Sequence, residues 1–209
     1  MEKLTRKKLN IFIKEFASNE KILDIGAGSG YGKKFFPNRI SLDIDPNKNP
    51  DIVSDIHNMS IDDDSFDTIL CTEVLEHLKD PKQAITEMKR VLKPGGKLIL
   101  TTRFVFPVHT YQYDYYRFTE FGLRELFKDW KIEKFVEEAG SLETIAILLQ
   151  RIIFQTKFKG NKLIKGVLSA LIYFFLFLQK LVRKEYADIR HEREYKNFIC
   201  SGYYLVCKK

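Results

Sequence analysis

Cysteine is scarce in this chain, with three residues in 209, and Cys71, Cys200 and Cys207 lack the spacing of a metal site. A sparse and odd set of cysteines favours free thiols and a reducing compartment over a disulfide framework. The four histidines form no cluster with metal-ligand spacing either, so the sequence predicts no metal site. The first residues lack the apolar stretch of a signal peptide, and we therefore expect a cytoplasmic protein.

Long uncharged stretches are also missing, with one exception near the C-terminus. From Gly166 to Gln179 the chain carries no charge, which is short for a confident membrane span. Residues 151–209 hold 13 Lys and Arg against 4 Asp and Glu, a balance of +9, whereas residues 1–150 balance at −2. Because the basic excess is confined to the end of the chain, it favours an anionic surface such as lipid as a partner there, and we expect no nucleic acid.

The rest of the composition is that of a globular protein, with 44% hydrophobic and 30% charged residues. This length predicts a single domain over residues 1–209. Short apolar runs alternate with helical patterns. Strands are predicted at 21–25, 39–46, 51–55, 66–71 and 97–102, and helices at 4–17, 33–36, 81–92 and 119–127, the last with Thr119 as its N-cap. The alternation predicts an α/β fold with a doubly wound, mostly parallel sheet, in which ligands bind at the carboxyl ends of the strands.

A glycine-rich turn, residues 26–30, follows the first predicted strand, and Asp24 precedes it. Glycines there let the backbone approach a ligand closely. The glycines here alternate with other residues, so no register places a third glycine where the nicotinamide dinucleotide fingerprint requires it. This spacing argues against that cofactor. Asp43, at the end of the second strand, suits ribose hydroxyls, and Asp24 suits a cationic amino group. S-adenosylmethionine carries both groups.

Several segments resemble, in order and spacing, the motifs of class I S-adenosylmethionine-dependent methyltransferases of the type 11 group. They are Asp24–Gly30, Leu42-Asp43-Ile44, Asp55, Ser65-Phe66-Asp67, Glu73–Leu78 and Leu92–Leu98. The resemblance spans roughly residues 20–105, the expected cofactor-binding core. It implies a Rossmann-like sheet of seven strands. The last two are expected at 130–135 and, antiparallel, at 198–207.

The resemblance also implies which residues hold the cofactor, mostly at the ends of the first four strands. Asp24 is implied to anchor its amino-acid end, while Gly26, Ala27 and Gly28 line the methionine and ribose. Asp43 is implied to accept from the ribose hydroxyls with Ile44 against the adenine, Asp55 to bind the adenine amino group beside Ile56, and Cys71 and Thr72 to lie under the sulfonium.

The acceptor is expected to lie against an aromatic-rich stretch, residues 103–119. Part of this stretch is similar to methyltransferases of glycan and cell-surface biosynthesis clusters. Its aromatic and polar residues describe either a small-molecule pocket or a loop with Asp114 and Arg117 as a structural ion pair. His109 is the preferred general base because its ordinary pKa lies near neutrality, and Asp114 is the second catalytic candidate. Glu76 and His77 either contact the cofactor or seat the start of a helix.

A helical insertion is predicted at residues 141–197, with helices at 142–158 and 162–183. Basic residues flank its apolar second helix, which favours a peripheral position on the inner membrane face. A hairpin that buries its apolar side on the core or in a homodimer is the alternative.

Three functions remain open from the sequence. The first is methyl transfer to a small-molecule acceptor, most directly O-methylation of a saccharide or lipid-linked glycan. The second is a membrane-associated lipid or quinone methyltransferase. The third is a non-catalytic cofactor-binding module with an interaction role, which the full set of acids at the strand ends disfavours.

Overall fold

The computed structural model describes residues 2–28 and 30–209, so Ser29 of the glycine turn lies outside the described residues. The chain divides into two compact units. The sheet unit comprises residues 10–103, 108–136 and 203–209, and the helical unit comprises residues 1–9, 104–107 and 137–202. The assignment of residues 1–209 to one domain, with a core at 20–105, stays a prediction.

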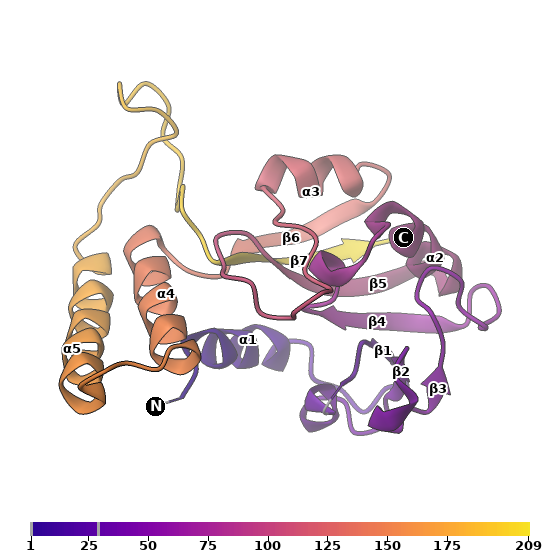
Figure 1. The fold of residues 1–209 in the computed structure, drawn as a ribbon. Coiled ribbons are helices and arrows are strands. Elements are labelled where there is room, and N and C mark those ends of the chain that lie inside the picture. Colours follow the sequence, from indigo (N-terminus) through magenta and orange to yellow (C-terminus); the bar gives the residue numbers. More distant parts are fainter. Residues whose placement is uncertain (1, 29) are drawn as a thin grey trace. The chain divides into compact units, whose positions relative to one another are not determined.

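One sheet contains seven strands in the order β3-β2-β1-β4-β5-β7-β6 (Figure 1). The strands are β1 (Leu23–Ile25), β2 (Ile40–Asp43), β3 (Ile52–Val53), β4 (Phe66–Thr72), β5 (Leu92–Arg103), β6 (Lys131–Glu137) and β7 (Gly202–Lys208). The pairs β1–β2, β2–β3, β1–β4 and β4–β5 are parallel, and the C-terminal strands are antiparallel. The predicted α/β class, mostly parallel with seven strands, is confirmed.

The strand order reverses next to β1, because β2 and β3 lie on one side of it and β4 and β5 on the other. Ile25 at the end of β1 is in register with Leu42 of β2 and Cys71 of β4. The carboxyl ends of the three strands therefore meet at one edge. In open α/β sheets, a reversal of this kind leaves the crevice in which ligands bind.

One helix precedes the first strand, and short helices follow several of the strands. They are α1 (Leu4–Lys14), the 3-10 helices η1 (Tyr31–Lys34), η2 (Pro46–Lys48) and η3 (Leu75–His77), and the α-helices α2 (Pro81–Val91) and α3 (Glu120–Leu126). At the start of helix α2, Asp80 Oδ1 caps the helix by accepting from the Gln83 N–H at 3.0 Å. The predicted cap of α3 is confirmed, since Thr119 Oγ1 accepts from the Gly122 N–H at 3.1 Å.

The start of β5 differs from the sequence-based expectation. The expected helix ended at residue 92 and the expected strand began at residue 97, whereas α2 ends at Val91 and β5 begins at Leu92. Leu92 pairs with Phe66 across an irregularity in the ladder. Gly95 adopts φ +78°, and a Cβ on Gly96 would lie 2.9 Å from the Lys93 carbonyl. The glycines thus continue the strand through a kink where we expected a break.

The helical unit contains α4 (Ser141–Gln155) and α5 (Asn161–Gln179), close to the two helices predicted for the insertion. Ala146 and Ile153 of α4 pack with Ile172 of α5 in a small core, lined further by Leu4, Leu149, Leu168, Phe175 and Leu176. Residues 162–179 of α5 are long and apolar enough to cross a membrane, with mean hydropathy 1.6, and only 6% of them are buried.

Candidate active site at the carboxyl ends of the strands

The glycine turn is held between the end of β2 and the segment that follows β4. The N–H groups of Gly26 and Ala27 both donate to the Leu42 carbonyl, at 2.8 and 3.3 Å. Gly26 has φ +66°, and a Cβ there would lie 2.3 Å from Cγ2 of Val74. Only glycine fits this position, both for its backbone conformation and for the close approach of Val74.

Asp43 joins the turn to β2. Its carboxylate is buried and accepts hydrogen bonds from the N–H groups of Gly28 and Asp45, each at 3.0 Å. Lys48 Nζ lies 3.4 Å from Asp43 Oδ2. A cleft of about 450 Å³ opens here, lined by Ala27, Gly28, Gly30, Arg39, Ser41, Asp43, Lys48, Asn49 and Pro50. Three of the predicted cofactor residues thus share one cleft, while Ile44 follows them with 66% of its surface exposed.

Asp24 is buried in the middle of β1 and has a partner that sequence reasoning missed. Arg39 Nε lies 3.0 Å from Asp24 Oδ2. Burial raises the pKa of Asp24 to about 6, although Arg39 opposes this rise. A Cβ on Gly32 would lie 2.2 Å from the same oxygen, so this glycine makes room for the carboxylate. The role of Asp24 at the amino-acid end of the cofactor stays a prediction.

The remaining predicted cofactor residues are more dispersed. Asp55 accepts from the His57 N–H at 2.9 Å, and this bond lowers the pKa of Asp55. Ile56 beside it is buried. Cys71 is fully buried, which raises the pKa of its thiol, and Thr72 ends β4 in register with Thr101. These positions surround the carboxyl ends of β3 and β4, where the resemblance places the adenine and the sulfonium.

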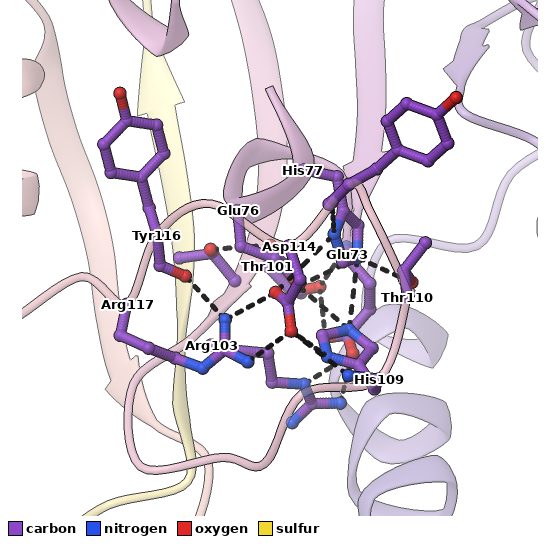
Figure 2. A network of polar contacts seen from close by, with 12 residues as sticks. Glu73, Glu76, His77, Thr101, Arg103, His109, Thr110, Asp114, Tyr116 and Arg117 are labelled. Carbon is purple, nitrogen blue, oxygen red and sulfur yellow. Dashed lines mark hydrogen bonds and ion pairs between the residues drawn. The ribbon is translucent and has the colours of Figure 1, made fainter. Parts of the chain in front are cut away.

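A dense polar network follows β4 and β5 (Figure 2). Glu73 adopts φ +58°, rare for a residue with a side chain, and accepts from Arg103 Nε at 2.6 Å. Glu76 is completely buried, and its Oε2 accepts from Thr102 Oγ1 at 2.8 Å. Burial and the neighbouring Glu73 raise the pKa of Glu76 well above its ordinary value.

The two histidines of this network meet. His77 lies on η3 and His109 on the segment after β5, and their Nε2 atoms are 3.1 Å apart. Burial, together with His77, lowers the pKa of His109 to about 4, so His109 is neutral at pH 7. A neutral imidazole can accept a proton, but the lowered pKa makes His109 a weaker base than a histidine of ordinary pKa.

Asp114 forms the ion pair that the sequence left as an alternative. Its oxygens accept from Arg117 Nη1 at 2.6 Å and Nη2 at 2.7 Å. This pairing holds the pKa of Asp114 down to about 2. Asp114 also accepts from the backbone N–H of His109 at 3.1 Å. It is therefore a carboxylate that is ionised at neutral pH and positions His109, and a direct catalytic role for it stays a prediction.

Comparison with known proteins supports the cofactor assignment. Residues 23–100 match the family model described as a methyltransferase domain. The ubiquinone biosynthesis O-methyltransferase of Xanthomonas oryzae is 55% identical over 38 residues, which cover 18% of this chain and 16% of that protein. The thiol S-methyltransferase TMT1B of Mus musculus is 30% identical over 122 residues, covering 46% of this chain and 50% of that protein. The matches therefore span half or less of these relatives.

Solved structures agree in fold. The [4+2]-cyclase SpnF is similar over 97% of this chain and 80% of its own, with a TM-score of 0.62 and 14% identity. A SAM-dependent methyltransferase from Aquifex aeolicus is similar over 64% of this chain and 86% of its own, with a TM-score of 0.52 and 19% identity. At these identities the likeness concerns the fold alone. Together with the family match, it makes residues 23–100 similar in sequence and in fold to a methyltransferase domain, the class of domain that takes S-adenosylmethionine as its cofactor.

Proposed function

We propose that this chain is an S-adenosylmethionine-dependent methyltransferase that acts on a small-molecule acceptor. The observation that carries the proposal is the turn at Gly26–Gly28, hydrogen-bonded to buried Asp43 within the part of the chain that matches the methyltransferase family. When bound, S-adenosylmethionine supplies the methyl group on a sulfonium, which keeps the electron pair of the broken S–C bond while an acceptor lone pair forms the new one.

The residues of this chain contribute position and charge. The bare backbone of the glycine turn gives the cofactor a surface without side chains, and Asp43 offers a carboxylate to its ribose. Such alignment accounts for up to about 7–11 kcal/mol of the barrier in well-oriented reactions. His109, neutral at pH 7, is the predicted acceptor of the proton that an acceptor hydroxyl must lose.

For the acceptor, we propose a saccharide or lipid-linked glycan that is methylated on oxygen. Four tyrosines follow β5 with exposed side chains, namely Tyr111, Tyr113, Tyr115 and Tyr116. Aromatic faces beside a few fixed polar groups fit a cyclic small molecule. A quinone or another lipid is the second candidate, favoured by the partial matches to ubiquinone and demethylmenaquinone methyltransferases. A thiol acceptor is favoured only by the partial match to TMT1B.

The test of the proposed activity is the formation of S-adenosylhomocysteine from S-adenosylmethionine in the presence of glycan, quinol and thiol acceptors. We expect turnover with one class, and at least about a tenfold loss of kcat/KM in Asp43→Ala, because hydrogen bonds to charged groups contribute about 1.5–3 kcal/mol. Asp45→Ala is the matched control, because the half-buried Asp45 side chain accepts from the Asn47 N–H and caps η2. Absence of turnover with every class, while the cofactor still binds, would favour the non-catalytic module.

We also propose that α5 lies on an anionic membrane surface, as a peripheral contact of a cytoplasmic protein. One face of α5 packs on α4, yet four residues of α5 and Leu181 just after it expose between 51% and 77% of their surface. The four are Leu163, Val167, Phe174 and Phe177. These positions recur at helical spacing, so they form one apolar stripe. Six exposed or half-exposed basic residues flank it: Lys159, Lys162, Lys165, Lys180, Arg183 and Lys184.

Vesicle flotation tests this contact. We expect the wild-type chain to float with phosphatidylglycerol vesicles at low salt, more weakly with neutral vesicles, and the pair Phe174→Glu and Phe177→Glu to stay behind. Ile11→Glu, on α1 and 61% exposed, is the control and should float. A wild type that fails to float, or a homodimer that only the double variant dissociates, would assign the stripe to a second copy of the chain.

A further inference from the structure

Three side chains of the sheet unit converge on one point in the polar network (Figure 2). His77 Nε2 and His109 Nε2 are 3.1 Å apart, and Glu76 Oε1 lies 4.0 Å from the first and 3.8 Å from the second. Glu76 and His77 come from η3 after β4, and His109 comes from the segment after β5. Adjacent strands thus deliver two imidazoles and one carboxylate to a single place.

Glu76 gives this point a buried carboxyl oxygen. The residue is fully buried, and one of its two carboxyl oxygens, Oε2, accepts from Thr102 Oγ1. Oε1 has no hydrogen-bond partner among the residues that the structure describes. A buried carboxylate oxygen left without a partner is costly, so its position between two imidazole nitrogens requires an explanation.

The outer sides of both imidazoles are already occupied by acceptors. His77 Nδ1 lies 2.6 Å from the Tyr113 carbonyl, which can only accept, so Nδ1 carries the hydrogen and neutral His77 turns a lone pair inward at Nε2. His109 Nδ1 lies 3.5 Å from Asp114 Oδ2, so its outer side also faces a carboxylate. The two Nε2 atoms lie within hydrogen-bond distance of each other. With the hydrogen of each imidazole on Nδ1, two nitrogen lone pairs and one carboxylate oxygen face one another, an arrangement that a cation stabilises.

We propose that Glu76, His77 and His109 bind a divalent transition-metal cation. Metal-to-nitrogen bonds of about 2.0–2.1 Å place neighbouring ligand atoms about 3–3.4 Å apart. The two nitrogens already have this separation, and Glu76 needs to move by less than about 1 Å. Ligating histidines are typically backed on their other nitrogen by a carbonyl or a carboxylate, as both are here. A set of two imidazoles and one carboxylate suits Zn²⁺, Co²⁺ or Fe²⁺ better than Mg²⁺.

Binding of the cation does not depend on the proposed methyl transfer. A role for the cation in catalysis, however, rests on that proposed function. Val74, three residues before His77, packs over Gly26 of the glycine turn, so the metal cluster adjoins the cofactor site. Three protein ligands leave coordination positions for an acceptor oxygen, whose pKa the cation lowers. His109 then serves as a ligand, and the cation takes the place of the base that the sequence predicted.

The experiment uses the full chain, stripped with a chelator and titrated with Co²⁺, Zn²⁺ and Mg²⁺ by calorimetry and visible absorption. We expect one equivalent of Co²⁺ to bind with the ligand-field bands of a nitrogen and oxygen site, and without a thiolate charge-transfer band, since all three cysteines are buried. His77→Ala, His109→Ala and Glu76→Gln should each lower the affinity at least about 100-fold. His191→Ala, an exposed histidine of the helical unit, should bind as the wild type does.

Cofactor binding, measured on the same samples, separates this inference from the proposed function. A stripped wild type that binds S-adenosylmethionine but no Co²⁺ or Zn²⁺ overturns the metal site alone. Binding of Mg²⁺ without a response to Co²⁺, or Co²⁺ binding that survives in folded His77→Ala and His109→Ala, also overturns it. If an alanine variant fails to fold, His109→Asn and the wild-type titration decide. Turnover that stops with the chelator and returns with the cation supports the ligand role of His109 over the base role.

Discussion

The packing of Gly26 against Val74 yields a quantitative prediction for the glycine turn. In Gly26→Ala the new Cβ meets Val74 Cγ2 at 2.3 Å, and the residue must keep φ +66°. The left-handed conformation costs a residue with a side chain roughly 1–2 kcal/mol, and overpacking costs typically about 1–3 kcal/mol. We therefore expect Gly26→Ala to lower the free energy of unfolding by about 2–5 kcal/mol.

A double-mutant cycle separates the two costs. Val74→Ala removes Cγ2 and leaves the Val74 Cβ 3.6 Å from the new atom, an ordinary contact. In this background, Gly26→Ala should lose only the backbone term of about 1–2 kcal/mol, which gives a coupling energy of about 1–3 kcal/mol. Gly28→Ala is the control, because its φ is +46° but its nearest neighbour is 3.7 Å away. Urea unfolding measures all four variants. An equal cost of Gly26→Ala in both backgrounds would refute the close approach.

Three further predictions concern Asp24, the cap of α3 and the core of the helical unit. Burial raises the pKa of Asp24 to about 6, although Arg39 opposes this rise and the neighbouring Cys71 thiol is protonated. A cofactor ammonium beside Asp24 would lower this pKa, so binding would release a proton. The affinity for S-adenosylmethionine should therefore rise from pH 5 to pH 7. Calorimetry in two buffers of different ionisation enthalpy detects that proton, and an affinity independent of pH would show that Asp24 does not face the ammonium. Thr119→Ala should cost about 1 kcal/mol, whereas Thr119→Ser should restore most of it; equal stability of all three proteins in urea would contradict the cap. Ile172→Ala should destabilise the packing of α5 on α4 by about 2–5 kcal/mol, seen as faster amide hydrogen exchange in both helices, and unchanged exchange would argue against this core.

The sheet could be predicted from the sequence because the signals for strands and turns are local. Apolar runs such as residues 66–71 and the glycine turn mark buried strands and the switch point by composition alone. The cap at Thr119 was predictable for the same reason. The start of β5 was not, because Pro94-Gly95-Gly96 reads as a break, while the pairing of Leu92 with Phe66 continues the strand through it. A long-range pairing here overrode a local signal.

The candidate site shows the same difference between local signals, which could be predicted, and long-range contacts, which could not. Asp43 and Gly28 were predicted as neighbours of one ligand, and the structure joins them by a hydrogen bond. The partnership of Asp24 with Arg39 was missed, because it crosses from β1 to the start of β2 and depends on burial. His77 and His109 are 32 residues apart, so no spacing rule could bring their nitrogens together. Only the placement of two strand ends at one edge does so, and for the same reason the sequence predicted no metal.

The central claim is that the glycine turn and Asp43 form a site for S-adenosylmethionine. Calorimetric titration of the purified full chain with S-adenosylmethionine tests it most directly, with Asp43→Ala and Asp45→Ala alongside. We predict saturable binding at one site per chain, weakened at least about tenfold by Asp43→Ala and unchanged by Asp45→Ala. A folded wild-type chain that binds no S-adenosylmethionine, or an Asp43→Ala chain that binds it with undiminished affinity, would contradict the account.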